Sequence, residues 1–272
     1  MLKIGFIGVG NMGSVMIAGI KKTHPTAQLY ATDPNQAKLQ AVTQQYHIES
    51  CQSLLEIAKK SHYIVVAVKP QSYDAVLTEL RPHLKTQQIV VTVAVGYLLS
   101  RAMRYLGNQA KIIRSMPNIP ALVGAGMSAI VANQNITDEE KKQSQTIFAS
   151  FGKVLWLDEK YFDIFSAISG SLPAYICIVI EALCDAAVEH GLPRTQSYEV
   201  ISQAILGSAK WVQVSAQRPA MLKDQVCSPG GTTIAAVAAL EKGKLRNTLI
   251  NAVNASMVRT KELSEQKNDL FL

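Results

Sequence analysis

A short apolar run that leads into a glycine-rich turn and a helix constrains the fold of this chain more than any other feature. Lys3-Ile4-Gly5-Phe6-Ile7 has strand character, Gly8-Val9-Gly10-Asn11-Met12-Gly13 follows directly, and helix-type residues continue to Ile20. A G-x-G-x-x-G turn between a strand and a helix is typical of a dinucleotide-binding sheet. We expect Gly8 to make the turn, Gly10 to let a pyrophosphate approach the backbone, and Gly13 to let helix and strand pack closely.

Apolar runs of strand length recur through the first half of the chain, separated by polar helical or turn segments. They are Gln28–Thr32, His62–Val68, Ile89–Val95, Lys111–Ser115 and Val154–Leu157. This alternation predicts a doubly wound parallel sheet. From Tyr161 onwards, apolar residues recur at helical spacing with little strand signal. We therefore expect an α/β Rossmann-type domain in residues 1–158 and an all-α domain in residues 159–272.

The ends of two predicted strands supply candidates for a nucleotide site. Asp33 follows Gln28–Thr32, where Rossmann domains place the residue that hydrogen-bonds the adenosine ribose. A carboxylate there accepts hydrogen bonds from both ribose hydroxyls of NAD and repels the 2′-phosphate of NADP, so the sequence favours NADH without excluding NADPH. Asp33-Pro34 is, however, also typical of an ordinary turn. Ala67-Val68-Lys69-Pro70 ends a buried strand at the carboxyl edge, where open α/β sheets bind ligands.

Charge and cysteine content narrow the possible functions. The formal net charge is +7, but Lys and Arg are scattered, which favours attraction of small anions over nucleic-acid binding. The four cysteines form neither a C-x-x-C pair nor a metal-ligand cluster, which indicates reduced, mostly buried thiols in a cytoplasmic protein without a metal site. The five histidines lie mostly in polar, turn-like stretches and suggest no Ser-His-Asp set, which disfavours a nucleophilic hydrolase.

The second half contains more apolar helical surface than a domain of its size usually buries alone, so we expect dimerisation through it. Its most apolar stretch, Leu172 to Val188, contains Pro173 near its start and Glu181 and Asp185 within it. These residues argue against a membrane span and for a helix buried on several sides.

A second glycine turn, late in the chain, predicts an anion site. Ser228-Pro229-Gly230-Gly231-Thr232-Thr233 directly precedes the apolar run from Ile234 to Leu240. A helix that starts there presents backbone N–H groups with no helical acceptor, and such an end attracts anions. The neighbouring hydroxyls can donate or accept hydrogen bonds but do not change charge near neutral pH. We expect this turn to hold a carboxylate, so that the two domains together suggest hydride transfer to a small acid.

The segment Cys227 to Thr233, with Leu222-Lys223-Asp224 before it and Leu240-Glu241-Lys242-Gly243 and Arg246 after it, resembles the signature of the pyrroline-5-carboxylate reductases. Other segments that resemble this family run through most of the chain. They are Gly8–Gly13, Ala67–Pro70, Arg114–Pro120, Ser169–Tyr175, Glu181–Arg194 and Ala252–Leu263.

The resemblance implies reduction of the cyclic imine 1-pyrroline-5-carboxylate to L-proline by NAD(P)H, and a helical C-terminal domain that interlocks two subunits and completes the active site between them. In the late turn, Ser228, Gly230 and the backbone of Gly231 and Thr232 would hold the substrate carboxylate, and the Thr233 hydroxyl would hydrogen-bond the ring nitrogen. The cofactor residues would be Gly8, Gly10, Asn11, Met12 and Gly13 at the pyrophosphate, Asp33 at the adenosine ribose, and Ala67, Val68, Lys69 and Pro70 beside the nicotinamide ribose.

Three positions depart from the family pattern. Leu172 stands where the family usually has glycine, Ile119 where it usually has threonine, and Asp33 is not suited to a phosphate. Two alternatives therefore remain open. One is a reductase of another small cyclic imine or of a hydroxy acid, which would want a catalytic lysine such as Lys210. The other is a non-catalytic dinucleotide-binding regulatory protein.

Overall fold

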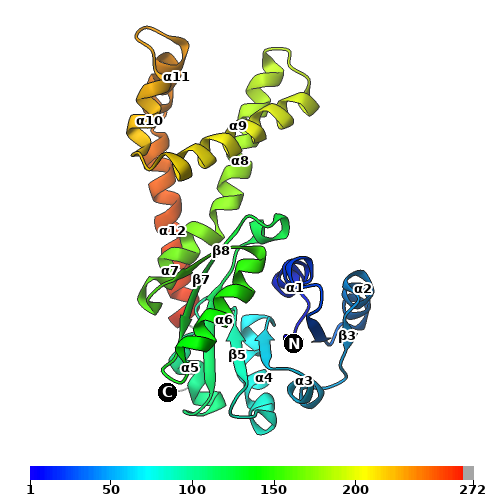
Figure 1. Ribbon diagram of the computed structural model, residues 1–272. Helices are drawn as coiled ribbons and strands as arrows, with labels where there is room; N and C mark the ends of the chain where they lie inside the picture. Colours follow the sequence, from blue (N-terminus) through cyan, green and yellow to red (C-terminus); the bar gives the residue numbers. More distant parts are fainter. Residues whose placement is uncertain (266–272) are drawn as a thin grey trace. The chain divides into compact units, whose positions relative to one another are not determined.

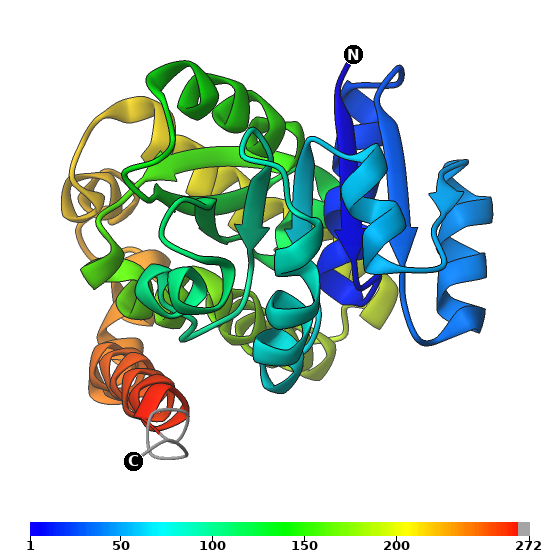
Figure 2. The same cartoon turned by 90° about the horizontal axis from the view of Figure 1, so that it is seen from below.

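The computed structural model describes residues 1–265, and its first compact unit is built on one eight-stranded sheet (Figures 1 and 2). The strands lie in the order β3-β2-β1-β4-β5-β6-β7-β8. Neighbouring strands are parallel except β6 and β7. Their bounds are β1 (Lys3–Ile7), β2 (Gln28–Thr32), β3 (Glu49–Ser50), β4 (Tyr63–Val66), β5 (Ile89–Thr92), β6 (Lys111–Met116), β7 (Gly126–Ala132) and β8 (Gly152–Trp156). This arrangement confirms the predicted Rossmann-type architecture.

Two hydrophobic cores cover the two faces of this sheet. Because side chains alternate along a strand, Val65 of β4 packs in the first core and its neighbours Ile64 and Val66 in the second. The first core contains residues of α1 (Asn11–Thr23), α2 (Gln36–Tyr46) and α6 (Asp138–Phe148). The second core contains residues of α3 (Leu54–Lys60), α4 (Tyr73–Leu80) and α5 (Leu99–Leu106).

Strand β7 is absent from the sequence-based prediction. Its first residues, Gly126-Met127-Ser128-Ala129, are mostly small and lack the β-branched run that marks the other strands. The short helix η3 (Ile119–Val123) connects it to β6 without a long crossover, so the pair is antiparallel. The Asn118 side chain accepts a hydrogen bond from the Met127 N–H at 2.9 Å and so fixes the start of β7.

Residues after β8 remain attached to the sheet unit. Contacts group Met1–Gly170 with the end of α12 from Met257, and Ser171–Ser256 forms a second unit. The buried Arg114 on β6 donates to Glu159 at 2.9 Å, and Asn118 donates to the Ser169 carbonyl at 3.1 Å. These bonds hold the segment 159–170, which the sequence analysis assigned to the helical domain. The boundary expected near Asp158 stays a prediction, and residues 266–272 of the expected second domain lie outside the described residues. The segment 159–170 contains η5 (Glu159–Tyr161), α7 (Phe162–Phe165) and η6 (Ser166–Gly170).

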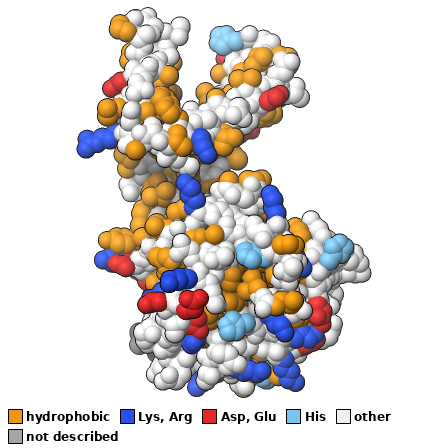
Figure 3. Space-filling model, in the orientation of Figure 1, with side chains coloured by type: hydrophobic (Ala, Val, Ile, Leu, Met, Phe, Trp, Pro, Cys, Tyr) orange, Lys and Arg blue, Asp and Glu red, His pale blue; other side chains and the backbone are white. Residues whose placement is uncertain are grey.

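The second unit is helical. Its helices are α8 (Leu172–Glu189), α9 (Arg194–Ser215), α10 (Pro219–Val226), α11 (Thr232–Lys242) and the first part of α12 (Leu245–Glu265). Many apolar side chains on these helices are exposed in the single chain (Figure 3). They include Ile178, Leu183, Val200, Leu206 and Ile250.

Helix α8 differs from the expectation of a helix buried on several sides, because Cys184 is its only buried residue. A protomer on its own exposes the apolar faces that another chain would cover. Cys51 is also buried, Cys227 is half-buried and Cys177 is exposed, so the expectation of mostly buried thiols is confirmed for two of the four cysteines in the single chain. Among residues 1–265, the helical run Glu159–Glu189 contains an 18-residue window with a mean hydropathy of 1.8, so by length and composition alone this run could cross a membrane.

Gly152 is required where β8 begins. Its φ is +152°, and a Cβ at this position would overlap the backbone of Gly126 on β7. We expect Gly152→Ala to lower the free energy of unfolding by about 2 to 3 kcal/mol, because it combines backbone strain with a clash against another strand. Urea unfolding measures this change. Gly170→Ala is the control, since its Cβ would meet Ser166 Oγ at an ordinary 3.7 Å. Equal stability of the two variants would contradict the prediction.

Candidate active site

The glycine turn brings β1, β4 and α1 into close backbone contact. Gly8 has a φ of +98°, and a Cβ there would lie 2.8 Å from the Ala67 carbonyl oxygen. A Cβ on Gly13 would overlap the Gly8 carbonyl oxygen. A Cβ on Gly10, in contrast, would meet no atom within 4 Å. The first and third glycines therefore permit close packing, and the second leaves open space over the backbone.

Helix α1 starts at this turn with an N-terminus that no side chain caps. Gly10 is the N-cap residue, and the first turn contains no acidic residue. The first helical hydrogen bond joins the Ser14 N–H to the Gly10 carbonyl at 3.0 Å. The N–H groups of Asn11, Met12 and Gly13 therefore have no acceptor within the helix, and an anion is the natural partner for such a group of donors.

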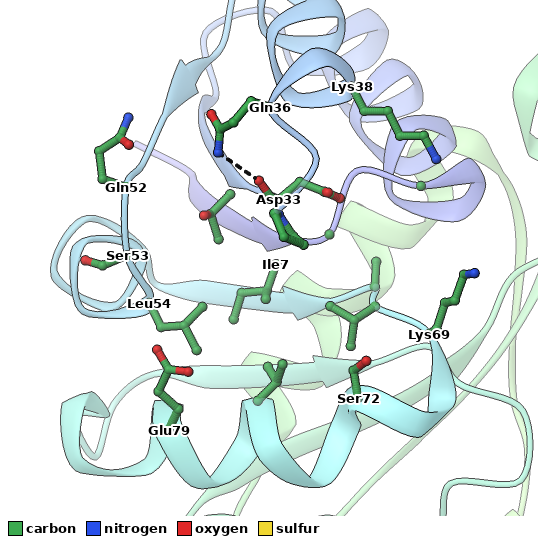
Figure 4. Close-up of a pocket in the computed structure, with 17 residues that line it drawn as sticks. Ile7, Asp33, Gln36, Lys38, Gln52, Ser53, Leu54, Lys69, Ser72 and Glu79 are labelled. Atoms are coloured by element: carbon green, nitrogen blue, oxygen red, sulfur yellow. Dashed lines mark hydrogen bonds between the residues drawn. The ribbon is translucent and has the colours of Figure 1, made fainter.

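A cavity of about 560 Å³ lies along the carboxyl edge of β1, β2 and β4 (Figure 4). Six predicted cofactor residues line it: Gly8, Gly10, Asp33, Ala67, Val68 and Lys69. Asn11 lines a neighbouring cavity of about 380 Å³, which shares Gly10 and Lys38 with the first. Met12, Gly13 and Pro70 do not line either cavity. Most predicted cofactor residues thus come together at one edge of the sheet.

Asp33 links the end of β2 to the glycine turn. Its Oδ2 accepts a hydrogen bond from the Val9 N–H at 2.9 Å, and its Oδ1 accepts one from the Asn35 N–H at 2.8 Å. The Gln36 amide donates to the Asp33 carbonyl at 3.3 Å, the dashed line in Figure 4. Asp33 therefore opens a turn and faces the cavity at the same time, so the two sequence-based interpretations are compatible. Each carboxylate oxygen keeps a lone pair for another donor.

Several lining residues were missed in the sequence analysis. Lys38 on α2 lines both cavities and supplies a positive charge that the sequence analysis did not identify. Its position within the first turns of the helix after Asp33 is the signal that could have identified it. Gln52 and Ser53 precede α3 and Glu79 lies on α4, so only the folded sheet brings them to the cavity.

The residues present at this edge fit a dinucleotide. The uncapped start of α1 suits a pyrophosphate, and Gly10 leaves room for it. Ile7, Leu54 and Val76 give the cavity apolar walls against which a flat base can pack. Polar groups from Asp33, Gln36 and Ser53 lie beside these walls, as hydroxyl groups of a ribose require.

The predicted substrate turn lies in the second unit, at the start of α11. Gly231 is the N-cap of this helix, no side chain caps it, and the first turn contains no acidic residue. The Gly231 N–H donates to the Ser228 carbonyl at 3.0 Å, and the Ala235 N–H donates to the Gly231 carbonyl at 3.3 Å. A Cβ on Gly231 would overlap Ser228 Oγ, so glycine lets the serine hydroxyl lie against the backbone.

The hydroxyls and free N–H groups at this turn can bind an anion without any change of protonation. Thr232 and Thr233 form the first turn of α11 and both are exposed. The N–H groups of Thr232, Thr233 and Ile234 have no acceptor within the helix. Within residues 1–265, no three His, Cys, Asp or Glu side chains cluster in a way that could hold a metal ion.

Comparisons with known protein families match both parts of the chain. Residues 159–263 match the family model described as pyrroline-5-carboxylate reductase dimerisation, and residues 3–96 match the one described as NADP oxidoreductase, coenzyme F420-dependent. The chain is 40% identical over 265 residues to pyrroline-5-carboxylate reductase of Escherichia coli, covering 97% of this chain and 98% of that protein.

Solved structures give the same result. The fold is similar to Plasmodium falciparum pyrroline carboxylate reductase with NADP bound, with a TM-score of 0.86, 33% identity, and coverage of 97% of this chain and 98% of that one. It is also similar to a pyrroline-5-carboxylate reductase from Coxiella burnetii, with a TM-score of 0.88, 33% identity, and coverage of 96% and 98%. With this identity along nearly its whole length, the chain belongs to the pyrroline-5-carboxylate reductase family of NAD(P)-dependent oxidoreductases.

Proposed function

We propose that this protein reduces 1-pyrroline-5-carboxylate to L-proline, the last step of proline biosynthesis. The observation that carries the proposal is the 40% identity over 97% of the chain, because it spans both the glycine turn and the turn Ser228 to Thr233. The nicotinamide of NAD(P)H supplies the hydride when it is bound. The residues of this chain bind the two reactants, orient them and exclude water.

On the cofactor side, Gly8, Gly10, Asn11, Met12 and Gly13 hold the pyrophosphate: Gly8 and Gly10 shape the turn, and the N–H groups of Asn11, Met12 and Gly13 donate to the phosphates. The uncapped start of α1 supports this role. Asp33 binds the adenosine ribose, and its position in the cavity supports that role. Ala67, Val68, Lys69 and Pro70 border the nicotinamide ribose at the end of β4.

On the substrate side, Ser228, Gly230 and the backbone of Gly231 and Thr232 hold the carboxylate, for which the Thr232 N–H is a donor without an acceptor in the helix. The start of α11, which no side chain caps, supports this assignment. The Thr233 hydroxyl hydrogen-bonds the ring nitrogen and steadies it as its charge disappears. An imine that arrives protonated from solution needs no strong acid from the protein, which agrees with a turn built from hydroxyl and backbone groups.

An enzyme assay separates this function from the alternatives. Oxidation of NADH and of NADPH is followed with pyrroline-5-carboxylate as substrate, and proline and hydroxy acids serve as controls. We expect turnover with pyrroline-5-carboxylate. Turnover only with another imine or with a hydroxy acid would indicate a different reductase. Cofactor binding without turnover would indicate a regulatory protein, for which Leu172 and Ile119 would be the distinguishing positions.

Self-association is a property of the dimerisation family that the second half of the chain matches. We propose a homodimer formed through the helical domain, residues 159–272, in a cytoplasmic enzyme that binds no nucleic acid and no membrane. A groove of about 450 Å³ between α8 and α9, lined by Leu183, Val200, Ile205 and neighbours, supports such a contact. Glu181 and Asp185 within the apolar run of α8 favour a subunit contact over a membrane span.

The role of Thr233 predicts a difference between two adjacent variants. We expect Thr233→Ala to lower kcat/KM by roughly 10- to 100-fold, the loss of about 1.5 to 3 kcal/mol of hydrogen bonding in the transition state. Thr232→Ala is the matched control, because it removes the same hydroxyl one residue earlier and keeps the backbone N–H that binds the carboxylate. Steady-state kinetics measure both. Unchanged kinetics in Thr233→Ala would remove this residue from the mechanism.

The carboxylate of Asp33 predicts a preference for NADH over NADPH. We expect Asp33→Ser to reduce the ratio of kcat/KM for NADH to that for NADPH by about tenfold, because a serine no longer repels a phosphate. Serine can still accept the Asn35 N–H bond, so the turn should persist. Lys38→Gln should shift the ratio the opposite way. A wild-type enzyme that prefers NADPH would contradict the assignment.

The groove on α9 predicts a variant that separates the subunits. Val200 lines the groove and is 58% exposed in the single chain, so Val200→Glu should leave the protomer folded. Burying an unpaired carboxylate in a dimer contact should raise the dimer Kd at least about 100-fold. Gln203→Glu adds the same charge at an exposed α9 position outside the groove and serves as the control. Light scattering across a concentration series measures both, and a dimer unchanged in Val200→Glu would contradict the prediction.

A further inference from the structure

A buried tyrosine hydroxyl lies between two strands at the cofactor edge of the sheet. Tyr73 is the first residue of α4, and its side chain has no exposed surface. Its hydroxyl donates to the Val66 carbonyl at the end of β4. The same oxygen accepts a hydrogen bond from the Val93 N–H, just after β5, at 3.0 Å. One side chain therefore connects the carboxyl ends of two neighbouring strands.

The hydroxyl occupies the place of a ladder hydrogen bond. At the other end of the same pair of strands, the Ile89 N–H bonds directly to the His62 carbonyl at 3.0 Å. The equivalent pair further along the strands is Val93 and Val66, because Val66 and Thr92 are the last residues in register. These two groups do not bond to each other and both bond to Tyr73 instead. The hydroxyl thus satisfies both backbone groups while holding β4 and β5 apart.

The surroundings keep this hydroxyl neutral and fixed. Burial raises the pKa of Tyr73 far above its ordinary value, and the Val93 and Ala94 N–H groups only partly oppose this shift. The ring packs against Tyr97 with centroids 4.7 Å apart. The Tyr97 hydroxyl donates to Asp74 at 2.7 Å, and Arg101 forms an ion pair with the same carboxylate at 2.6 Å. The Tyr73 side chain is therefore held in one position, and its hydroxyl keeps the proton that it donates to the Val66 carbonyl.

The strand end held by Tyr73 continues directly into the wall of the cofactor cavity. Ala67, Val68 and Lys69 follow Val66, and all three line the cavity. We propose that Tyr73 is a positioning residue for the cofactor: its hydroxyl sets the separation of β4 and β5 and so the place of the cavity wall. This inference rests on the proposed function for the identity of the ligand. Without the hydroxyl, the Val66 carbonyl and the Val93 N–H can bond directly, which draws Ala67 and its neighbours towards β5.

The test compares two buried tyrosines whose hydroxyls lie at opposite ends of β4. Tyr73→Phe keeps the ring and removes the hydroxyl. Tyr63→Phe is the matched control, because Tyr63 is buried at the other end of β4 and its hydroxyl donates to Gln143 at 3.5 Å. NADH binding is measured by fluorescence titration, together with kinetics and thermal unfolding. We expect Tyr73→Phe to raise the Kd for NADH about tenfold, the affinity equivalent of one hydrogen bond, and Tyr63→Phe to leave it unchanged. The KM for pyrroline-5-carboxylate at saturating NADH should not change in either variant.

Each outcome supports or contradicts the inference. If Tyr73→Phe lowers the melting temperature but leaves the Kd for NADH unchanged, Tyr73 has a structural role only. If Tyr63→Phe raises the Kd for NADH as much as Tyr73→Phe does, the effect comes from a general loss of order in the sheet. Either result contradicts the inference. If Tyr73→Phe does not fold, amide exchange in the wild type decides: NADH should slow exchange at Val93, and identical exchange with and without NADH contradicts the inference. Wild-type NADH binding without turnover of pyrroline-5-carboxylate overturns the proposed function alone. Absence of both NADH and NADPH binding overturns both.

Discussion

The close approach of α1 to the end of β1 is the constraint on which the cofactor edge depends. Because a Cβ on Gly13 would overlap the Gly8 carbonyl, the start of α1 can lie at the carboxyl edge only with glycine there. The Val9 N–H between these residues bonds to Asp33 at 2.9 Å, so the end of β2 is fixed to the same turn. Gly8 in turn packs against Ala67 at the end of β4. The cavity is the space that remains where these three strand ends and one helix start meet.

The sequence predicted those parts of the fold whose cause is local. Buried parallel strands are nearly continuous apolar runs, so β1, β2, β4 and β5 were recognisable from composition alone. Strand β7 was not, because its small residues form a strand through hairpin pairing with β6. The attachment of the segment 159–170 depends on the buried Arg114 and on Asn118, whose partners lie 45 and 51 residues away in the chain. The exposed apolar face of α8 is explained by self-association. The sequence of one chain indicates this contact only through an excess of apolar residues on its helices.

The residues of the candidate site also divide into those that the local sequence predicts and those that only the folded chain brings together. Glycine turns are local, and their place before α1 and α11 could be predicted because a helix start follows from the residues beside it. Lys38, Gln52 and Glu79 come from different elements and reach the cavity only through the order of the strands. In the sequence, Tyr73 is typical of an ordinary core residue. Its proposed role depends on the register of β4 and β5, which places the Val66 carbonyl and the Val93 N–H on either side of its hydroxyl.

The groups assigned to the reactants are mostly backbone N–H groups and hydroxyls, and this limits how the protein can accelerate the reaction. Such groups keep the same charge throughout, so they act by position and not by proton transfer. A backbone donor is only as well placed as the strand or helix that carries it. Residues that fix strand ends, such as Asp33 through Val9 and Tyr73 through Val66 and Val93, therefore act on the proposed reaction through the backbone groups that they position. If the proposed roles are correct, the internal hydrogen bonds of the sheet edge help to place the groups that bind the cofactor.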